Sequence, residues 1–169
     1  MRQLLILRHA KSSHKNDKLA DYDRPLAKRG RRDSKRIGDW LNEQMLCPDY
    51  ILSSPAARSK QTALKIAKRI GFDKSRIKWD ERIYDSNNKT ILKVLADVPK
   101  EAECVLLVGH HLGLESLILN LSNWSDIPAE SKLLPTGGLA WFKTERSLSE
   151  LNKKGDAQLV TIVRPRNLG

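Results

Sequence analysis

The feature that most constrains the fold of this chain is a series of short, wholly apolar runs that alternate with stretches of helical periodicity. The runs at 4–7 and 104–108 are uncharged and short, and we interpret each as a strand buried on both faces of a sheet. Strands of this kind need helices on both sides of the sheet to cover them. Further strands are expected at 50–52, 77–79, 139–142 and 159–163.

The segments between these runs carry apolar residues at helical spacing. Arg24-Pro25-Leu26 opens the first helical pattern, which continues to Leu41, because proline suits the first turn of a helix. Ser53-Ser54-Pro55 indicates a second start, with a serine cap and Pro55 at the first helical position, and Gly71 indicates the end of that helix. Two more helices are expected, from Lys89 to Val98 ahead of Pro99, and from the Gly109-His110-His111 turn through Leu121.

Alternating strands and helices predict an α/β fold, specifically a three-layer αβα sandwich with a mostly parallel central sheet. The last two strands are close enough in sequence to form a hairpin or to lie side by side at an edge. The 169 residues fit one domain, and the sequence shows no internal repeat, low-complexity linker or change of composition. We therefore expect a single domain over residues 1–169.

The charge balance predicts an anionic partner, because 31 lysines and arginines against 20 acidic residues give a net charge of +11. Cys47 and Cys104 do not form a C-x-x-C pair, which argues against a disulfide framework and a zinc site. No window approaches the roughly 20 apolar residues of a membrane span, and the first residues enter a strand without a secretory leader. We expect a cytoplasmic protein with no membrane partner.

Polar residues that can carry chemistry follow three of the expected strands. Arg8-His9 follows the first strand, the turn that leads to Arg58 follows the second, and Gly109-His110 follows the run at 104–108. Because parallel strands have their carboxyl ends at one edge of a sheet, these segments should converge there. Two imidazoles and two guanidinium groups in one crevice, beside a helix N-terminus, predict a site for a phosphoryl group.

These residues resemble the motifs of the histidine phosphatase superfamily, the phosphoglycerate mutase-like group. Leu7-Arg8-His9-Ala10 is similar to its Arg-His-Gly signature, residues 53–63 to its second arginine motif, and Val108-Gly109-His110 to its second histidine motif. The short chain and the Asp23-Arg24-Pro25-Leu26 segment, followed by Gly30, resemble the SixA-type phosphohistidine phosphatases. The resemblance implies a phosphoglycerate mutase-like fold.

The resemblance also implies a covalent mechanism without a metal or another cofactor. His9 would be the nucleophile, and Arg8, Arg58 and His110 would hold the phosphoryl oxygens. Glu81 lies at roughly the place of the acid that protonates the leaving group in mutase-like relatives, and pairing with a nearby cation is an equal alternative for it. Arg24 would add a contact to the phosphate or the substrate.

Two positions depart from the family pattern. Ala10 stands where the signature usually has glycine, and we expect this small residue to be tolerated. His111 stands where many members have asparagine, so the second catalytic histidine is assigned to His110 and His111 has no assigned role. His14 and His111 also lack acidic or thiol neighbours at ligand spacing, which favours surface or supporting roles over metal binding.

The sequence thus predicts a metal-independent phosphatase that acts on phosphohistidine of a protein. A phosphatase for a small phosphorylated metabolite is the alternative within enzymes, and a basic module that only grips phosphate is the alternative outside them. The basic run from Lys28 to Arg36 is either a solvated helix face or a surface for a partner. The four tryptophans do not interleave with that run, so we do not expect nucleic-acid binding.

Overall fold

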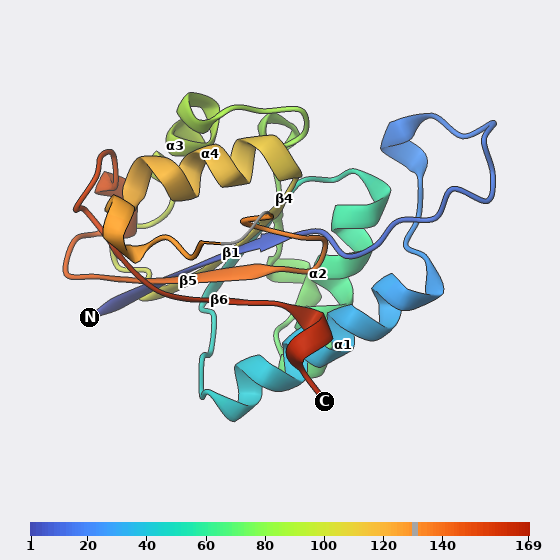
Figure 1. Cartoon of the computed structure of the whole chain (residues 1–169), viewed down its shortest axis with the longest axis horizontal. Helices are drawn as coiled ribbons and strands as arrows, with labels where there is room; N and C mark the ends of the chain where they lie inside the picture. The colour runs from blue at the N-terminus through green and yellow to red at the C-terminus, as the bar shows by residue number, and fades with distance from the viewer. Residues whose placement is uncertain (130–131) are drawn as a thin grey trace.

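The computed structural model describes residues 1–129 and 132–169, and it shows one six-stranded sheet between two layers of helices (Figure 1). The strand order across the sheet is β3-β2-β4-β1-β5-β6. The four strands β3, β2, β4 and β1 are parallel, and β5 runs antiparallel to both of its neighbours, β1 and β6. The strands are β1 (Arg2–Arg8), β2 (Tyr50–Ser53), β3 (Lys78–Trp79), β4 (Cys104–Gly109), β5 (Leu139–Thr144) and β6 (Gln158–Val163).

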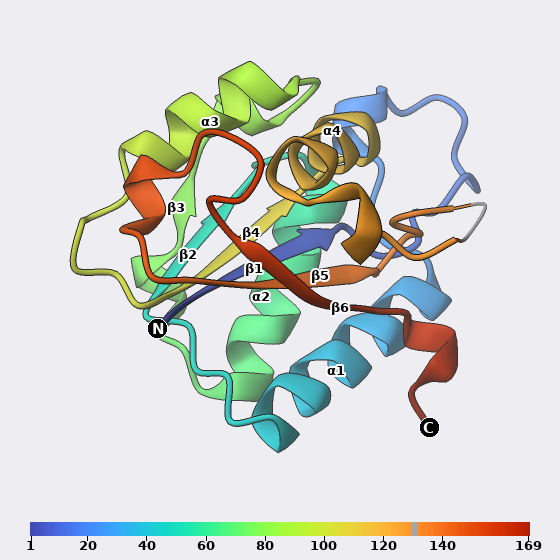
Figure 2. The ribbon, with the colours of Figure 1, turned by 60° about the vertical axis from the view of Figure 1, so that its left-hand side comes forward.

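The helices cover the sheet in pairs, as Figure 2 shows from a second direction. One face packs against α1 and α2, where Leu5 and Leu7 of β1 meet Ile37 and Ile66. The other face, which includes Leu4, packs against α3 and α4. The α/β sandwich with a mostly parallel sheet is therefore confirmed. The helices are α1 (Lys28–Glu43), α2 (Ala57–Ile70), α3 (Asn88–Ala96) and α4 (His111–Leu121).

Two predicted helix starts were wrong. Residues 24–26 precede α1, because Leu26 pairs as an isolated β-bridge with Ser12 and donates its N–H to the Gln61 side chain at 2.8 Å, which holds it extended. The second helix begins at Ala57 rather than Pro55, and its N-cap is Ala56. The end of α2 agrees with the prediction, because Gly71 adopts the left-handed conformation that glycine favours, at φ 75°.

The start of α1 lies very close to the chain that leaves β1. A Cβ atom at Gly30 would collide with the backbone carbonyl of Lys11, whose oxygen also accepts the N–H of Ala27 at 2.9 Å. Only glycine allows this approach, so Gly30 fixes the distance between α1 and the segment that follows β1. Over the described part of the chain, no helix is long and apolar enough to cross a membrane.

Candidate active site

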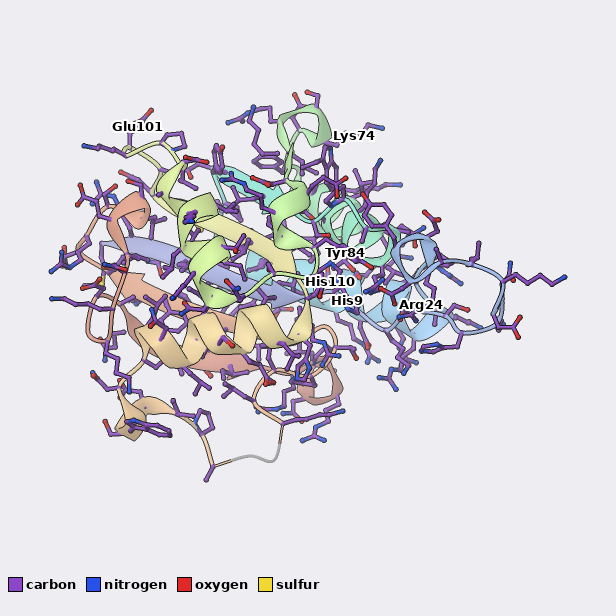
Figure 3. The ribbon with its side chains drawn as sticks, turned by 90° about the horizontal axis from the view of Figure 1, so that it is seen from above. His9, Arg24, Lys74, Tyr84, Glu101 and His110 are labelled. Carbon is purple, nitrogen blue, oxygen red and sulfur yellow. The ribbon has the colours of Figure 1, made fainter. Side chains whose placement is uncertain are left out.

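The three predicted segments meet at the carboxyl ends of β1, β2 and β4. The N–H of His9 donates to the Gly109 carbonyl at 2.9 Å, and the N–H of Ser54 donates to the Val108 carbonyl at 3.0 Å. These bonds continue the parallel ladder one residue past the strands and fix the loops relative to each other. Figure 3 shows His9 and His110 beside each other, with Tyr84 next to them and Arg24 nearby on the outer side.

His9 is held as a neutral imidazole with its Nε2 lone pair directed toward Arg58. Its Nδ1 donates to the backbone carbonyl of Ala10 at 2.8 Å, and its Nε2 accepts a hydrogen bond from Arg58 Nε at 3.3 Å. Burial lowers the pKa of His9 to about 3, the guanidinium groups of Arg58 and Arg8 act in the same direction, and the hydrogen bond to the Ala10 carbonyl acts against them. The Ala10 carbonyl is thus the acceptor that orients the ring, which the sequence alone could not name.

Thr62 connects the loop after β1 to α2. The N–H of Ala10 donates to Thr62 Oγ1 at 3.1 Å, and this hydroxyl in turn donates to the Arg58 carbonyl at 2.7 Å. Ala10 is fully buried, and its methyl group is accommodated where the family signature usually has glycine. The same threonine therefore fixes the backbone behind His9 and the first turn of the helix that carries Arg58.

His110 faces His9 across the site, with the two ring centroids 5.2 Å apart. Its Nε2 lies 2.8 Å from Ser54 Oγ and 3.3 Å from Ser59 Oγ, and the His110 and Tyr84 rings pack in a T-shaped arrangement with centroids 5.2 Å apart. Burial, followed by the charge of Arg58, lowers the pKa of His110 to about 4. The two serines belong to the motif that the sequence singled out, but no signal assigned them to this histidine.

Arg58 is anchored by Asp21, which sequence reasoning missed. Arg58 Nη1 donates to the Asp21 carbonyl at 2.7 Å, and its Nη2 donates to Asp21 Oδ2 at 3.0 Å. The same Oδ2 accepts from Tyr84 Oη at 2.8 Å. The Tyr84 hydrogen bond, followed by those from Arg24 and Arg58, holds the pKa of Asp21 far below its usual value, although partial burial acts against this. Asp21 lies in a polar stretch without a motif, so no pattern pointed to it.

The other predicted residues occupy different positions around this centre. Arg8 donates from Nη1 to the Leu134 carbonyl at 3.1 Å. Arg24 contacts the site through Asp21. Its Nη2 donates to Asp21 Oδ1 at 2.9 Å, and its Nη1 donates to Ser12 Oγ at 2.8 Å. Glu81 accepts from Tyr22 Oη at 2.8 Å and is exposed, so the structure does not bring its carboxylate next to His9.

A cleft of about 270 Å³ opens beside these groups. Arg58, His110 and Tyr84 line it, together with Asp85, whose φ of 50° is rare for a residue other than glycine. His111 also lines the cleft, and its Nε2 lies 3.1 Å from Glu115 Oε1, one helical turn further along α4, so the expectation that His111 has no acidic neighbour at this spacing was wrong. Across residues 1–129 and 132–169, no three His, Cys, Asp or Glu side chains gather at a distance suitable for holding a metal ion.

This arrangement can bind a tetrahedral anion and attack it. Arg58 Nε already points at the His9 lone pair, and Arg8 and His110 are close enough to act electrostatically on the same ring. A neutral nitrogen nucleophile among preorganised cations is suited to phosphoryl transfer, in which negative charge spreads over the equatorial oxygens.

The match to a known protein family is consistent with the geometry of this site. The sequence model described as histidine phosphatase superfamily (branch 1) matches residues 4–89. An uncharacterized protein of Mycobacterium tuberculosis is 32% identical over 165 residues, which cover 95% of this chain and all of that protein.

Two solved structures share the fold over almost the whole chain. A SixA protein from Agrobacterium tumefaciens, provisionally named a phosphohistidine phosphatase, is 27% identical, with a TM-score of 0.76 and coverage of 97% of this chain and 98% of that one. The protein histidine phosphatase SixA in complex with tungstate is 20% identical, with a TM-score of 0.79 and coverage of 98% of each chain.

Proposed function

The chain belongs to the histidine phosphatase superfamily, branch 1, and on this premise we propose that it is a metal-independent phosphatase that removes phosphoryl groups from phosphohistidine on a protein. The observation that carries the proposal is the state of His9: its Nδ1–H is committed to the Ala10 carbonyl, and its Nε2 lone pair faces Arg58. A nucleophile in this state needs no base to activate it.

In the first step, the Nε2 lone pair of His9 attacks phosphorus and forms a new N–P bond. The bond between phosphorus and the substrate nitrogen breaks, and its electron pair stays on the substrate ring, whose other nitrogen carries a proton taken from the solvent, so that the ring leaves as neutral imidazole. Arg58, Arg8 and His110 stabilise the charge on the transferring group. In the second step, water attacks the phosphohistidine on His9, its proton is lost to the solvent or the product, and the His9–phosphorus bond breaks to regenerate the neutral ring.

Two features support a phosphohistidine substrate over an alkyl phosphate. Glu81, the acid that the sequence pattern predicted, is exposed, and its carboxylate accepts a hydrogen bond from Tyr22 rather than from a group of the cleft. An imidazole leaves more readily than an alkoxide and tolerates a weak acid. The likeness to the SixA structures, one named a protein histidine phosphatase and the other provisionally named a phosphohistidine phosphatase, points in the same direction.

The direct test is to measure turnover by the purified protein with phosphoramidate, a phosphohistidine-bearing carrier protein and a panel of phosphate monoesters. We expect hydrolysis of the two P–N substrates, fastest with the carrier protein, and no loss of rate when a chelator is present. Faster turnover of a monoester would assign the enzyme to a small metabolite instead. Loss of activity with chelator would refute the metal-independent mechanism.

The His9→Ala variant separates the enzyme from a module that only binds phosphate. We expect the variant to lose turnover completely, because the nucleophile is gone. A protein whose main activity survived His9→Ala, and was abolished by charge reversal along Lys28 to Arg36, would instead be a binding module.

A further inference from the structure

A second hollow, lined mainly by cations, adjoins Arg8. It has a volume of about 470 Å³ and is formed by the start of α1, the loop before β5 and the C-terminal turn at Pro165–Asn167. Figures 1 and 2 both show that terminal turn beside α1. We call it the basic hollow and define it by the six lining residues on which the argument depends: Arg8, Lys11, Arg29, Arg32, Asp33 and Arg36.

One buried carboxylate organises three of these cations. The Asp33 side chain is only 7% exposed, and the guanidinium groups of Arg29, Arg32 and Arg36 lie 3.6–3.8 Å from its oxygens. These separations exceed hydrogen-bond distance, so the arginines are held nearby without committing their N–H donors to Asp33. A single carboxylate cannot neutralise three guanidinium groups, and the cluster keeps a positive excess that Lys11 and Arg8 increase.

Arg8 connects the basic hollow to the phosphoryl site. Its backbone bonds to the loop before β5, which forms one side of the hollow. The Arg8 N–H donates to the Gly138 carbonyl at 3.0 Å, and the Arg8 carbonyl accepts from Gly137 N at 3.1 Å. Its Nη1 donates to the Leu134 carbonyl, whereas its Nε is buried and has no hydrogen-bond partner among the described residues. A buried donor without a partner is costly and points to a ligand that completes it.

From these contacts we propose that the basic hollow binds an acidic side chain that lies beside the phosphohistidine on the substrate protein. This inference rests on the proposed function and names what the substrate must present. The Arg29 and Arg32 side chains are 56% and 58% exposed, so they are accessible to a side chain on a protein surface, whereas small-molecule pockets usually enclose their ligand. The net charge of +11 favours the approach of an acidic surface.

The test compares two phosphohistidine peptides of equal length, one with aspartates on both sides of the phosphohistidine and one with asparagines. For the full-length enzyme at low salt, we expect kcat/KM for the acidic peptide to exceed that for the neutral one roughly tenfold, as charge-assisted contacts of this kind allow. The double variant Arg29→Gln/Arg32→Gln should reduce this ratio to about one.

A matched control removes two positive charges from a different surface. Lys68 lies on α2 and Lys74 follows that helix, and neither lines the basic hollow. The double variant Lys68→Gln/Lys74→Gln should keep the wild-type ratio of kcat/KM between the two peptides. An equal ratio for both peptides with wild-type enzyme, or the same loss in both double variants, would overturn the proposal, because only the overall charge would then matter. Small bisphosphates and monophosphates are assayed alongside the peptides. If the enzyme preferred bisphosphates to monophosphates and did not distinguish the peptides, the assignment to a protein partner would be overturned.

Hydrolysis of phosphoramidate by the wild-type enzyme, measured in the same assay, separates the two proposals. If phosphoramidate is not hydrolysed, the proposed function fails. If it is hydrolysed and the peptides are not distinguished, only the role of the basic hollow fails.

Discussion

At the scale of single residues, the site depends on two imidazoles that the fold keeps neutral beside two guanidinium groups. Burial lowers the pKa of His9 to about 3 and that of His110 to about 4. In an unfolded chain both would titrate near 6.5. His9, the proposed nucleophile, therefore remains unprotonated across the physiological pH range without a base. The folded protein becomes less stable when the solution becomes acidic.

This loss of stability gives a prediction. Below about pH 6.5 the unfolded imidazoles take up protons while the folded ones do not, so the free energy of unfolding falls as the pH is lowered. The expected slope is up to about 1.4 kcal/mol per pH unit for each buried histidine. Urea unfolding at several values between pH 7 and pH 4.5 measures it, in a window above the range in which most carboxylates titrate.

The variant His9→Gln should reduce that slope, because one buried imidazole is removed. An unfolding free energy that stayed flat over the window in the wild-type protein would contradict the neutral, buried state of both rings.

Asp21 provides a second prediction at this scale, because its carboxylate and carbonyl hold two of the Arg58 nitrogens. We expect Asp21→Ala to lower kcat by roughly ten- to a hundredfold, since a misplaced guanidinium stabilises the transition state less well. Asp21→Asn retains an oxygen acceptor and should lose less. Steady-state kinetics with phosphoramidate measures both variants. An increase of kcat in Asp21→Ala would show that the carboxylate competes with the substrate for Arg58.

At the scale of elements, the position of α1 depends on its close approach to the chain that leaves β1. Gly30→Ala places a methyl group against the Lys11 carbonyl, a backbone atom that cannot rotate away. We expect this variant to lose about 1–3 kcal/mol of stability, the usual cost of overpacking. Thermal unfolding measures the loss, with the exposed Lys28→Ala on the same helix as the control. An unchanged melting temperature in Gly30→Ala would show that α1 can shift freely.

The elements also show what could be predicted from the sequence and what could not. The apolar runs at 4–7 and 104–108 identified the two central strands because complete burial leaves a continuous hydrophobic pattern. The starts of α1 and α2 were misplaced because Pro25 and Pro55 are acceptable in a first helical turn and equally acceptable just before one. Local preference could not reveal that Gln61, distant in sequence, holds Leu26 extended.

Some residues of the candidate site could likewise be predicted from the sequence, and others could not. His9, Arg58 and His110 follow strands, and the rule that parallel strands end at one edge was sufficient to bring them together. The contact of Asp21 with Arg58 was not predicted, because it depends on how the long loop after β1 folds back. The arginines around Asp33 were not predicted either, because their position depends on which face of α1 is buried. Such contacts are set by tertiary packing and leave no periodic signal in the sequence.

At the scale of the whole molecule, the sheet brings three distant segments to one edge, in a chain with a net charge of +11. Arg8 lines the basic hollow and lies close enough to His9 to affect its pKa, so the proposed attraction of an acidic protein and the proposed chemistry at His9 would take place on one surface. On the proposed mechanism, a covalent phosphohistidine forms on His9 during turnover.

Rapid acid-free quenching of the enzyme during phosphoramidate hydrolysis, followed by mass spectrometry of its peptides, measures this most directly. We predict one phosphoryl group on His9, stable in alkali, lost in acid and absent from His9→Ala. A phosphoryl group on another residue during turnover, or continued turnover by His9→Ala, would contradict the account.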